Sequence, residues 1–167
     1  NLLSTKGFNE IISYSFISKE DHDLFGEGVQ TLEVENPISQ NMTVMRTNLV
    51  SGLVSTFLYN LNHGQESQRL FETGNTFTLN NSKDLTEKNT LAGLMYGKVS
   101  KDNWKEKGKD TSFFYLKGVV QDLLGDFKGY RSYEACTIDF LHPGMSSLIK
   151  QDDKVIGFMG SLQPSIL

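Results

Sequence analysis

The sequence predicts an α+β fold in which helices cover an antiparallel β-sheet. Strand hairpins are expected at both ends of the chain, two long amphipathic helices lie between them, and the βαβ alternation of a doubly wound parallel sheet is absent. The chain has 167 residues, 38% of them apolar, which is long enough to bury a sizeable core. We therefore expect a single domain over residues 1–167.

The first strand is predicted over residues 9–18, which are rich in β-branched and aromatic side chains. Period-two alternation places Ile12, Tyr14 and Phe16 on one face, and Ile11, Ser13 and Ser15 on the other. Ser18 then caps a short helix with acidic residues in its first turn, and Gly26 or Gly28 ends it.

A short alternating strand is predicted over Thr31–Glu35, and the strongest helix of the chain follows it. Its apolar stripe consists of Leu49, Val50, Leu53, Val54, Phe57, Leu58 and Leu61. Thr47 or Asn48 caps the start, and Gly64 suits the left-handed position after the end. The polar residues expected on the outer face are Ser51, Thr56, Asn60 and Asn62.

Two further strands are predicted over residues 68–73 and 76–79, around a turn at Gly74-Asn75. A polar loop over residues 80–89 separates them from a strand at Thr90–Lys98, which is apolar enough to be buried on both faces. In that strand Gly93 and Gly97 allow close approach of another backbone or of a ligand.

A charged segment, Lys98–Asp110, surrounds Trp104 and is expected to be a solvated loop rather than a nucleic-acid contact. A second amphipathic helix is predicted over Ser112–Leu124, buried through Phe113, Leu116, Val120 and Leu123. Its interior Gly118 indicates a close packing contact. The remaining chain predicts strands over residues 133–140, 145–150 and 155–162, the last two forming a hairpin.

Composition excludes several classes of protein. A net charge of −4 is unlike that of a generally basic nucleic-acid coat protein. The single Cys136 cannot form an internal disulfide, so a reducing cytosol is expected, and the longest apolar stretch, Leu49–Leu61, is too short to span a membrane. We expect a soluble, cytoplasmic protein with no membrane partner.

Few residues offer catalytic chemistry. His22, His63 and His142 lack metal-ligand spacing. Asp139 and His142 could form an acid–base pair, but a tight turn at His142-Pro143-Gly144 is favoured. Arg46, directly before the long helix, indicates a specific ion pair or an interface contact.

An ordered series of short motifs resembles the β subunit of bacterial phenylalanyl-tRNA synthetases over nearly the whole chain. The motifs include Gly7-Phe8-Asn9-Glu10, Asn36-Pro37-Ile38-Ser39, Met45-Arg46-Thr47-Asn48-Leu49, Gly52-Leu53, Leu70-Phe71-Glu72-Thr73-Gly74, Leu116-Lys117-Gly118 and His142-Pro143-Gly144. The resemblance implies a catalytic-like core module with the fold of a class II synthetase. It also implies that the chain is a fragment of a longer β subunit.

The resemblance further implies that the working active site lies on a partner α subunit, in a heterotetramer of two α and two β subunits. ATP, Mg²⁺ and tRNA would be used by the whole enzyme, and no cofactor would be bound by this domain.

The residues themselves also favour a non-catalytic module. A class II site needs a strand-borne Arg-x-Glu, whereas Arg69-Leu70-Phe71-Glu72 is one residue longer, and no arginine follows Arg131. No catalytic, cofactor-binding or metal-binding residue is therefore assigned. Arg46, Arg69, Glu72 and His142 remain candidate structural or interface residues.

Two alternatives stay open at this point. One is a free-standing module with a degenerate synthetase fold that binds an amino acid or a nucleotide. The other is an enzyme in its own right, with Gly93 and Gly97 lining a pocket and Asp139 and His142 as acid and base.

Overall fold

The computed structural model describes residues 2–26, 28–100, 104, 107–125 and 129–166. Contacts divide the chain into two compact units, whose main segments are Leu3–Tyr96 and Gly97–Leu167. The predicted α+β class with antiparallel sheets is confirmed. The single domain over residues 1–167 stays a prediction.

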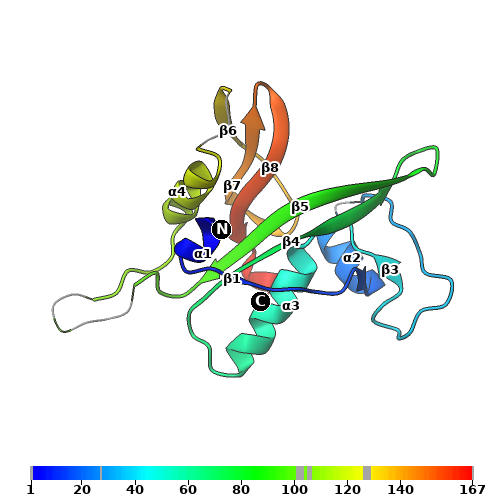
Figure 1. Cartoon of the computed structure of the whole chain (residues 1–167), viewed down its shortest axis with the longest axis horizontal. Helices are drawn as coiled ribbons and strands as arrows, with labels where there is room; N and C mark the ends of the chain where they lie inside the picture. Colours follow the sequence, from blue (N-terminus) through cyan, green and yellow to red (C-terminus); the bar gives the residue numbers. More distant parts are fainter. Residues whose placement is uncertain (1, 27, 101–103, 105–106, 126–128, 167) are drawn as a thin grey trace. The chain divides into compact units, whose positions relative to one another are not determined.

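The helices and strands follow one another as shown in Figure 1. They are α1 (Leu2–Thr5), β1 (Asn9–Glu10), β2 (Phe16–Ile17), α2 (Lys19–Phe25), β3 (Val44–Met45), α3 (Val50–Asn62), β4 (Gln68–Leu79), β5 (Leu85–Tyr96), α4 (Phe113–Leu123), β6 (Arg131–Ala135), β7 (Leu141–Gln151), β8 (Lys154–Leu162) and the 3₁₀ turn η1 (Pro164–Ile166). None of the described helices is both long and apolar enough to cross a membrane.

In the first unit, a three-stranded sheet has the order β1–β4–β5, and β2 pairs with β3 in a separate antiparallel sheet. β1 runs parallel to β4, with Asn9 opposite Leu70 and Glu10 opposite Phe71. Helix α3 packs on this sheet through Leu53 and Phe57, which form a core cluster with Leu70. The core of the first unit therefore lies between α3 and β4–β5.

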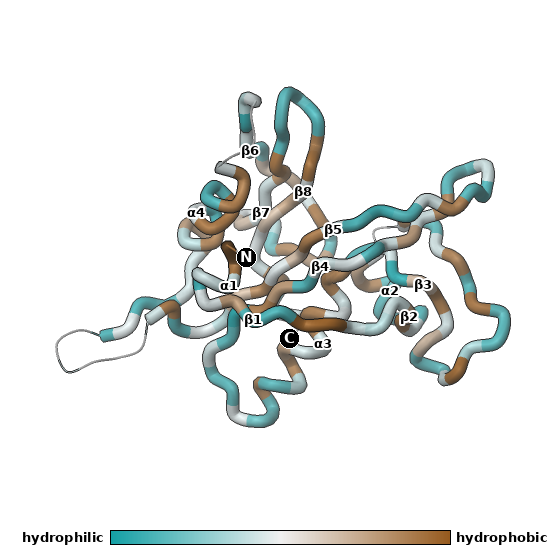
Figure 2. Tube along the Cα trace, viewed as in Figure 1, coloured by the Kyte–Doolittle hydropathy of each residue, from teal (hydrophilic) through white to brown (hydrophobic). Residues whose placement is uncertain are grey.

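The continuous strand predicted over residues 9–18 is wrong. Only its two ends are strands, β1 and β2, and residues 11–15 between them belong to neither sheet. Figure 2 shows that the chain directly after β1 is hydrophobic, yet Ile12 is 95% and Tyr14 is 73% exposed. The alternation itself holds, because Ile11 packs against the core cluster on the opposite face.

The short helix α2 is confirmed together with both of its ends. Ser18 is the N-cap and accepts a hydrogen bond from the Asp21 amide at 3.0 Å, and Gly26 follows the last turn. The strand predicted over Thr31–Glu35 is reduced to a single bridge between Glu33 and Val44. The neighbouring amide of Val34 donates to the Thr43 carbonyl, so this segment is extended without forming a full ladder.

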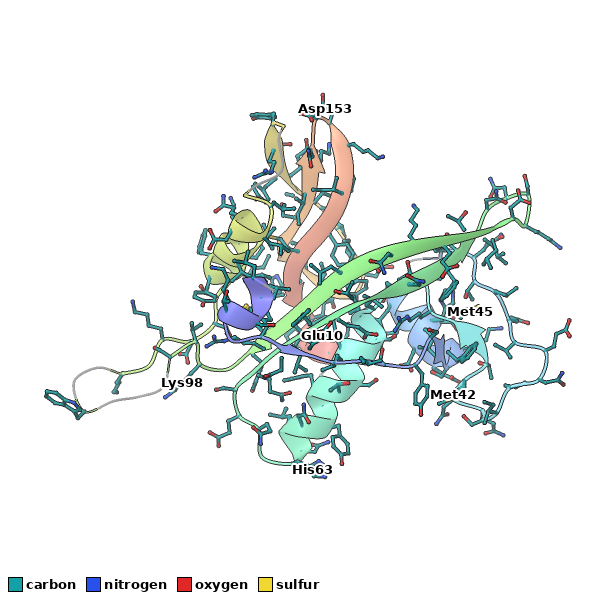
Figure 3. The ribbon with its side chains drawn as sticks, in the orientation of Figure 1. Glu10, Met42, Met45, His63, Lys98 and Asp153 are labelled. Atoms are coloured by element: carbon teal, nitrogen blue, oxygen red, sulfur yellow. The ribbon has the colours of Figure 1, made fainter. Side chains whose placement is uncertain are left out.

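Helix α3 is confirmed, with its C-terminal end at His63 (Figure 3) and Gly64 in the left-handed region at φ +84°. The predicted side-chain cap is shifted, because Leu49 is the N-cap residue and Asn48 Oδ1 accepts from the Val50 amide at 2.9 Å. Ser51 does not lie on the outer face as expected; it is 2% exposed.

The predicted turn at Gly74-Asn75 is wrong, because β4 runs unbroken through it. The true turn lies after Leu79, where Asn80 Oδ1 accepts from the amides of Ser82 and Asp84. β5 accordingly begins at Leu85, inside the loop predicted over residues 80–89. It is not buried on both faces, since Leu91 is 43% exposed. A Cβ on Gly93 would lie 3.3 Å from the Leu70 carbonyl oxygen, so close backbone approach there is confirmed.

The second unit contains the antiparallel sheet β6–β7–β8, and α4 contacts β8. The hairpin between β7 and β8 is confirmed, with Asp152 and Asp153 in the left-handed region at its turn (Figure 3). The strand predicted over residues 133–140 is wrong in extent. β6 begins earlier and ends at Ala135, so Cys136 lies just outside it and is half-buried.

Helix α4 is confirmed, with Ser112 as its N-cap rather than its first helical residue, but its burial differs from the prediction: Val119 is its only fully buried residue. Of the charged segment before it, residues 101–103 and 105–106 lie outside the described residues, and Trp104 is 96% exposed. The close packing contact expected at Gly118 is wrong, because a Cβ there would meet nothing within 4 Å.

Replacing Gly118 with alanine is therefore expected to raise the free energy of unfolding by about 0.5–1 kcal/mol. The gain arises because alanine restricts the unfolded chain and meets open space in the helix. Urea unfolding of the two proteins measures the difference. Gly52→Ala is the matched control and should destabilise, since its Cβ would overlap the Ser13 side chain. A Gly118→Ala protein no more stable than the parent would contradict the open position.

Candidate functional site

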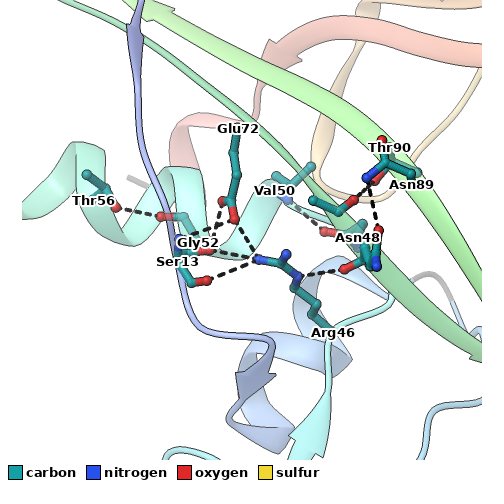
Figure 4. A network of polar contacts seen from close by, with 11 residues as sticks. Ser13, Arg46, Asn48, Val50, Gly52, Thr56, Glu72, Asn89 and Thr90 are labelled. Atoms are coloured by element: carbon teal, nitrogen blue, oxygen red, sulfur yellow. Dashed lines mark hydrogen bonds and ion pairs between the residues drawn. The ribbon is translucent and has the colours of Figure 1, made fainter.

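Two of the four predicted site residues, Arg46 and Glu72, meet in the interior of the first unit (Figure 4). Arg46 follows β3, and Glu72 lies in the middle of β4. Arg46 Nη1 is 2.7 Å from Glu72 Oε1, and the two residues are only 5% and 2% exposed. Of the two roles expected for Arg46, ion pair or interface contact, the structure shows the ion pair.

The remaining contacts of Arg46 join three segments of the chain. Its Nε donates to the Asn75 carbonyl at 2.9 Å. Its backbone amide donates to the Ser15 carbonyl, and its own carbonyl accepts from the Phe77 amide, both at 2.9 Å. Arg46 therefore ties residues 13–15 to β4 through backbone and side chain together.

Ser13 completes the network, although it is not among the residues predicted for the site. Its amide donates to Glu72 Oε1 at 3.2 Å, and its hydroxyl donates to Glu72 Oε2 at 2.7 Å. The same hydroxyl accepts from Arg46 Nη1 at 3.0 Å. Both carboxylate oxygens of Glu72 are thus occupied. The feature of the sequence that could have pointed to Ser13 is its position, because the alternation places this small polar residue on the face opposite Ile12 and Tyr14.

Two glycines make room for this network. A Cβ on Gly74 would overlap Arg46 Nη2, and a Cβ on Gly52 would overlap the Ser13 side chain. Gly74 is therefore explained by the approach of the guanidinium to β4 rather than by a turn. A buried pair of opposite charges with these additional partners is typical of a structural ion pair, since removal of either partner leaves an uncompensated charge.

Arg69 points away from this network within the first unit, and His142 belongs to the second unit. β4 pairs regularly with β5, so Arg69 and Glu72 face opposite sides of the sheet, and Arg69 Nη1 donates to the Lys6 carbonyl at 2.8 Å. His142 lies in β7, where its Nδ1 accepts from the Gly144 amide at 3.1 Å. Among the hydrogen bonds of the described residues, none joins the side chains of Asp139 and His142.

The structure describes a cavity of about 280 Å³ in the first unit, between the start of α2 and residues 33–44. Lys19, Glu33 and Thr43 contribute to its lining, and Lys19 Nζ lies 3.8 Å from Glu33 Oε1. Gly93 does not line this cavity. The observed cavity is therefore not the pocket that was expected along Gly93 and Gly97.

The fold resembles that of a class II aminoacyl-tRNA synthetase core. Two solved structures of pyrrolysyl-tRNA synthetase from Desulfitobacterium hafniense superimpose with TM-scores of 0.63 and 0.61 at 15% sequence identity. The matches cover 92% of this chain and 52% and 53% of those chains. At this identity the likeness establishes the fold alone.

The family model described as "Phenylalanyl tRNA synthetase beta chain CLM domain" matches residues 1–167, and the chain belongs to this family. Phenylalanine–tRNA ligase β subunits from Pseudomonas putida and Syntrophus aciditrophicus are each 36% identical over 99% of the chain. The β subunit from Haemophilus influenzae is 36% identical over 95%. The chain spans about a fifth of the length of these relatives, 20–22%.

Proposed function

We propose that this chain is a structural, catalytic-like module of a phenylalanine–tRNA ligase β subunit. In this role it supports an α subunit that attaches phenylalanine to its tRNA with ATP and Mg²⁺. The assembly would be a cytoplasmic heterotetramer of two α and two β subunits that binds tRNA as a whole. Membership of the β-chain family supports the proposal, because a β chain implies a partner chain.

The observation that carries the non-catalytic role is the burial of Glu72. An ATP site on this fold would need an Arg-x-Glu on a strand, and Glu72 is the only acid that follows an arginine on β4. Its carboxylate is 2% exposed and is bonded to Arg46 and Ser13. A carboxylate buried to this degree and already bonded through both oxygens is not accessible to a nucleotide in solution, which supports a structural role for Glu72.

Residues 11–15, which contain Ser13, also carry a surface suited to a partner on the face opposite Ser13. Ile12 and Tyr14 share one face of residues 11–15 and are 95% and 73% exposed. This segment continues from β1, which is the edge strand of its sheet. We call Ile12 and Tyr14 the apolar pair. Neighbouring apolar side chains exposed to this degree favour a protein-binding surface, and we assign it to the α subunit.

Binding to the α subunit tests this function directly. The full natural chain that carries these residues should bind the matching α subunit saturably and co-elute with it on a sizing column. Ile12→Asp should weaken binding about 10- to 100-fold, because burying an isoleucine contributes about 1.5–3 kcal/mol.

Ile38→Asp is the matched control, since Ile38 is 90% exposed in the same unit, outside the 11–15 segment. It should bind like the parent. If Ile12→Asp bound the α subunit as tightly as the parent, the apolar pair would not be part of the interface. Failure of the full chain to bind any α subunit would overturn the assembly role itself.

A further inference from the structure

We propose that Ser13 is a positioning residue. By bonding to the buried pair Arg46–Glu72, it holds the 11–15 segment so that the apolar pair faces outward. This inference rests on the proposed function, because it explains how the surface assigned to the α subunit is presented.

The 11–15 segment depends on side-chain attachment because the centre of the segment is not paired with any strand. The ladder with β4 ends at Glu10↔Phe71, and pairing resumes only at Phe16↔Met45. The segment is tied at its ends by the Ile11 amide, which donates to the Phe71 carbonyl at 2.8 Å, and by the Ser15 carbonyl, which accepts from Arg46. Between these ends, Ser13 is the residue that reaches the interior.

Ser13 is held by groups that are costly to leave unpaired. Three hydrogen bonds join its amide and hydroxyl to Glu72 and Arg46, at 2.7–3.2 Å. Each involves a charged partner, and such bonds are about twice as strong as neutral ones. Because both charged groups are buried, water cannot readily replace Ser13.

The direction of the apolar pair follows from this attachment. Side chains in an extended segment alternate, so an inward Ser13 turns Ile12 and Tyr14 outward. The hydrophobic effect does not settle this direction, since a slip of one residue would bury the apolar pair but would expose Ile11, which packs against the core. The buried network therefore selects the arrangement in which the apolar pair is free to bind.

The start of α3 is adapted to the same arrangement. Gly52 faces Ser13, and a side chain at that position would overlap it. The space beside Ser13 is thus kept open by a residue that otherwise weakens a helix.

The test is Ser13→Ala in the full natural chain. This variant keeps the 2.7 Å contact between Arg46 and Glu72 and removes only the hydroxyl that attaches the segment to it. We expect amide hydrogen exchange at residues 11–15 to accelerate at least about tenfold and affinity for the α subunit to fall at least about tenfold, because both bonds of the hydroxyl to charged groups are lost. Exchange in β4 and β5 should stay unchanged, which a general loss of stability would not allow.

Ser51→Ala is the matched control. Ser51 is a buried serine of the same unit, 2% exposed, and its hydroxyl has no hydrogen-bond partner. It should change neither exchange at residues 11–15 nor binding.

The outcomes separate this inference from the proposed function. Weak binding by Ile12→Asp combined with parent-like exchange and binding by Ser13→Ala would overturn the positioning role and leave the function standing. Accelerated exchange at residues 11–15 in Ser13→Ala, with parent-like binding by both variants, would support the attachment and overturn the assigned surface. Faster exchange in β4 and β5 as well would show that Ser13 acts on the fold generally, against the proposal.

Discussion

Replacing Arg46 with methionine is expected to lower the free energy of unfolding by about 3–5 kcal/mol. Methionine has no charge to balance Glu72, whose carboxylate would remain in the interior at 2% exposure. The loss includes the bonds of Arg46 to Asn75 and Ser13. Urea unfolding followed by circular dichroism measures the change from the midpoint and the slope of the transition.

Two further variants establish that the buried charge is the cause. Lys19→Met removes one partner of an exposed pair, in which the Lys19 and Glu33 side chains are 64% and 75% exposed, and should cost less than about 0.5 kcal/mol. Arg46→Met combined with Glu72→Gln should recover part of the loss, because it removes both charges. If Arg46→Met were as stable as Lys19→Met, the pair Arg46–Glu72 would not contribute measurably to the stability of the fold.

Replacing Phe57 with alanine is expected to cost about 3–5 kcal/mol. Phe57 is 1% exposed and joins α3 to the sheet through Leu70, and its ring centroid lies 5.0 Å from that of Tyr96. Truncation removes this burial and leaves a cavity that the helix and the sheet cannot both close. The midpoint of urea unfolding should shift to lower concentration while the slope stays unchanged.

Phe114→Ala provides the comparison, since it removes the same side chain from a position that is 81% exposed. Its cost should stay within about 0.5 kcal/mol. Equal losses for the two phenylalanines would contradict the packing of α3 against the sheet.

The local predictions that were confirmed are those in which neighbouring residues decide the structure. The apolar stripe of α3, the Ser18 cap and the β7–β8 turn each depend on residues within a few positions of one another. Gly74 and Gly118 were misjudged for the opposite reason. What surrounds a glycine is contributed by distant segments, a guanidinium at Gly74 and open space at Gly118.

In the candidate site, too, residue type could be read from the sequence, whereas the contacts depend on distant segments. Arg46, Arg69, Glu72 and His142 were selected by residue type and by resemblance, and only Arg46 and Glu72 came together. Their partner Ser13 lies 59 positions from Glu72 in the chain, and no local pattern marks that contact. The strand predicted over residues 9–18 failed at this same point, because side-chain bonds replace the ladder there.

By itself, the sequence determined the α+β class, the main helices, the C-terminal hairpin and the resemblance to the β-chain family. These follow from periodicity and from short motifs, which are local properties of the chain. Only the tertiary structure decided that Arg46 pairs with Glu72, that Ser13 joins them, and that Ile12 and Tyr14 face outward. The physical reason is that these contacts depend on how segments far apart in the chain are packed and in which register, and a one-residue slip would reverse every side chain.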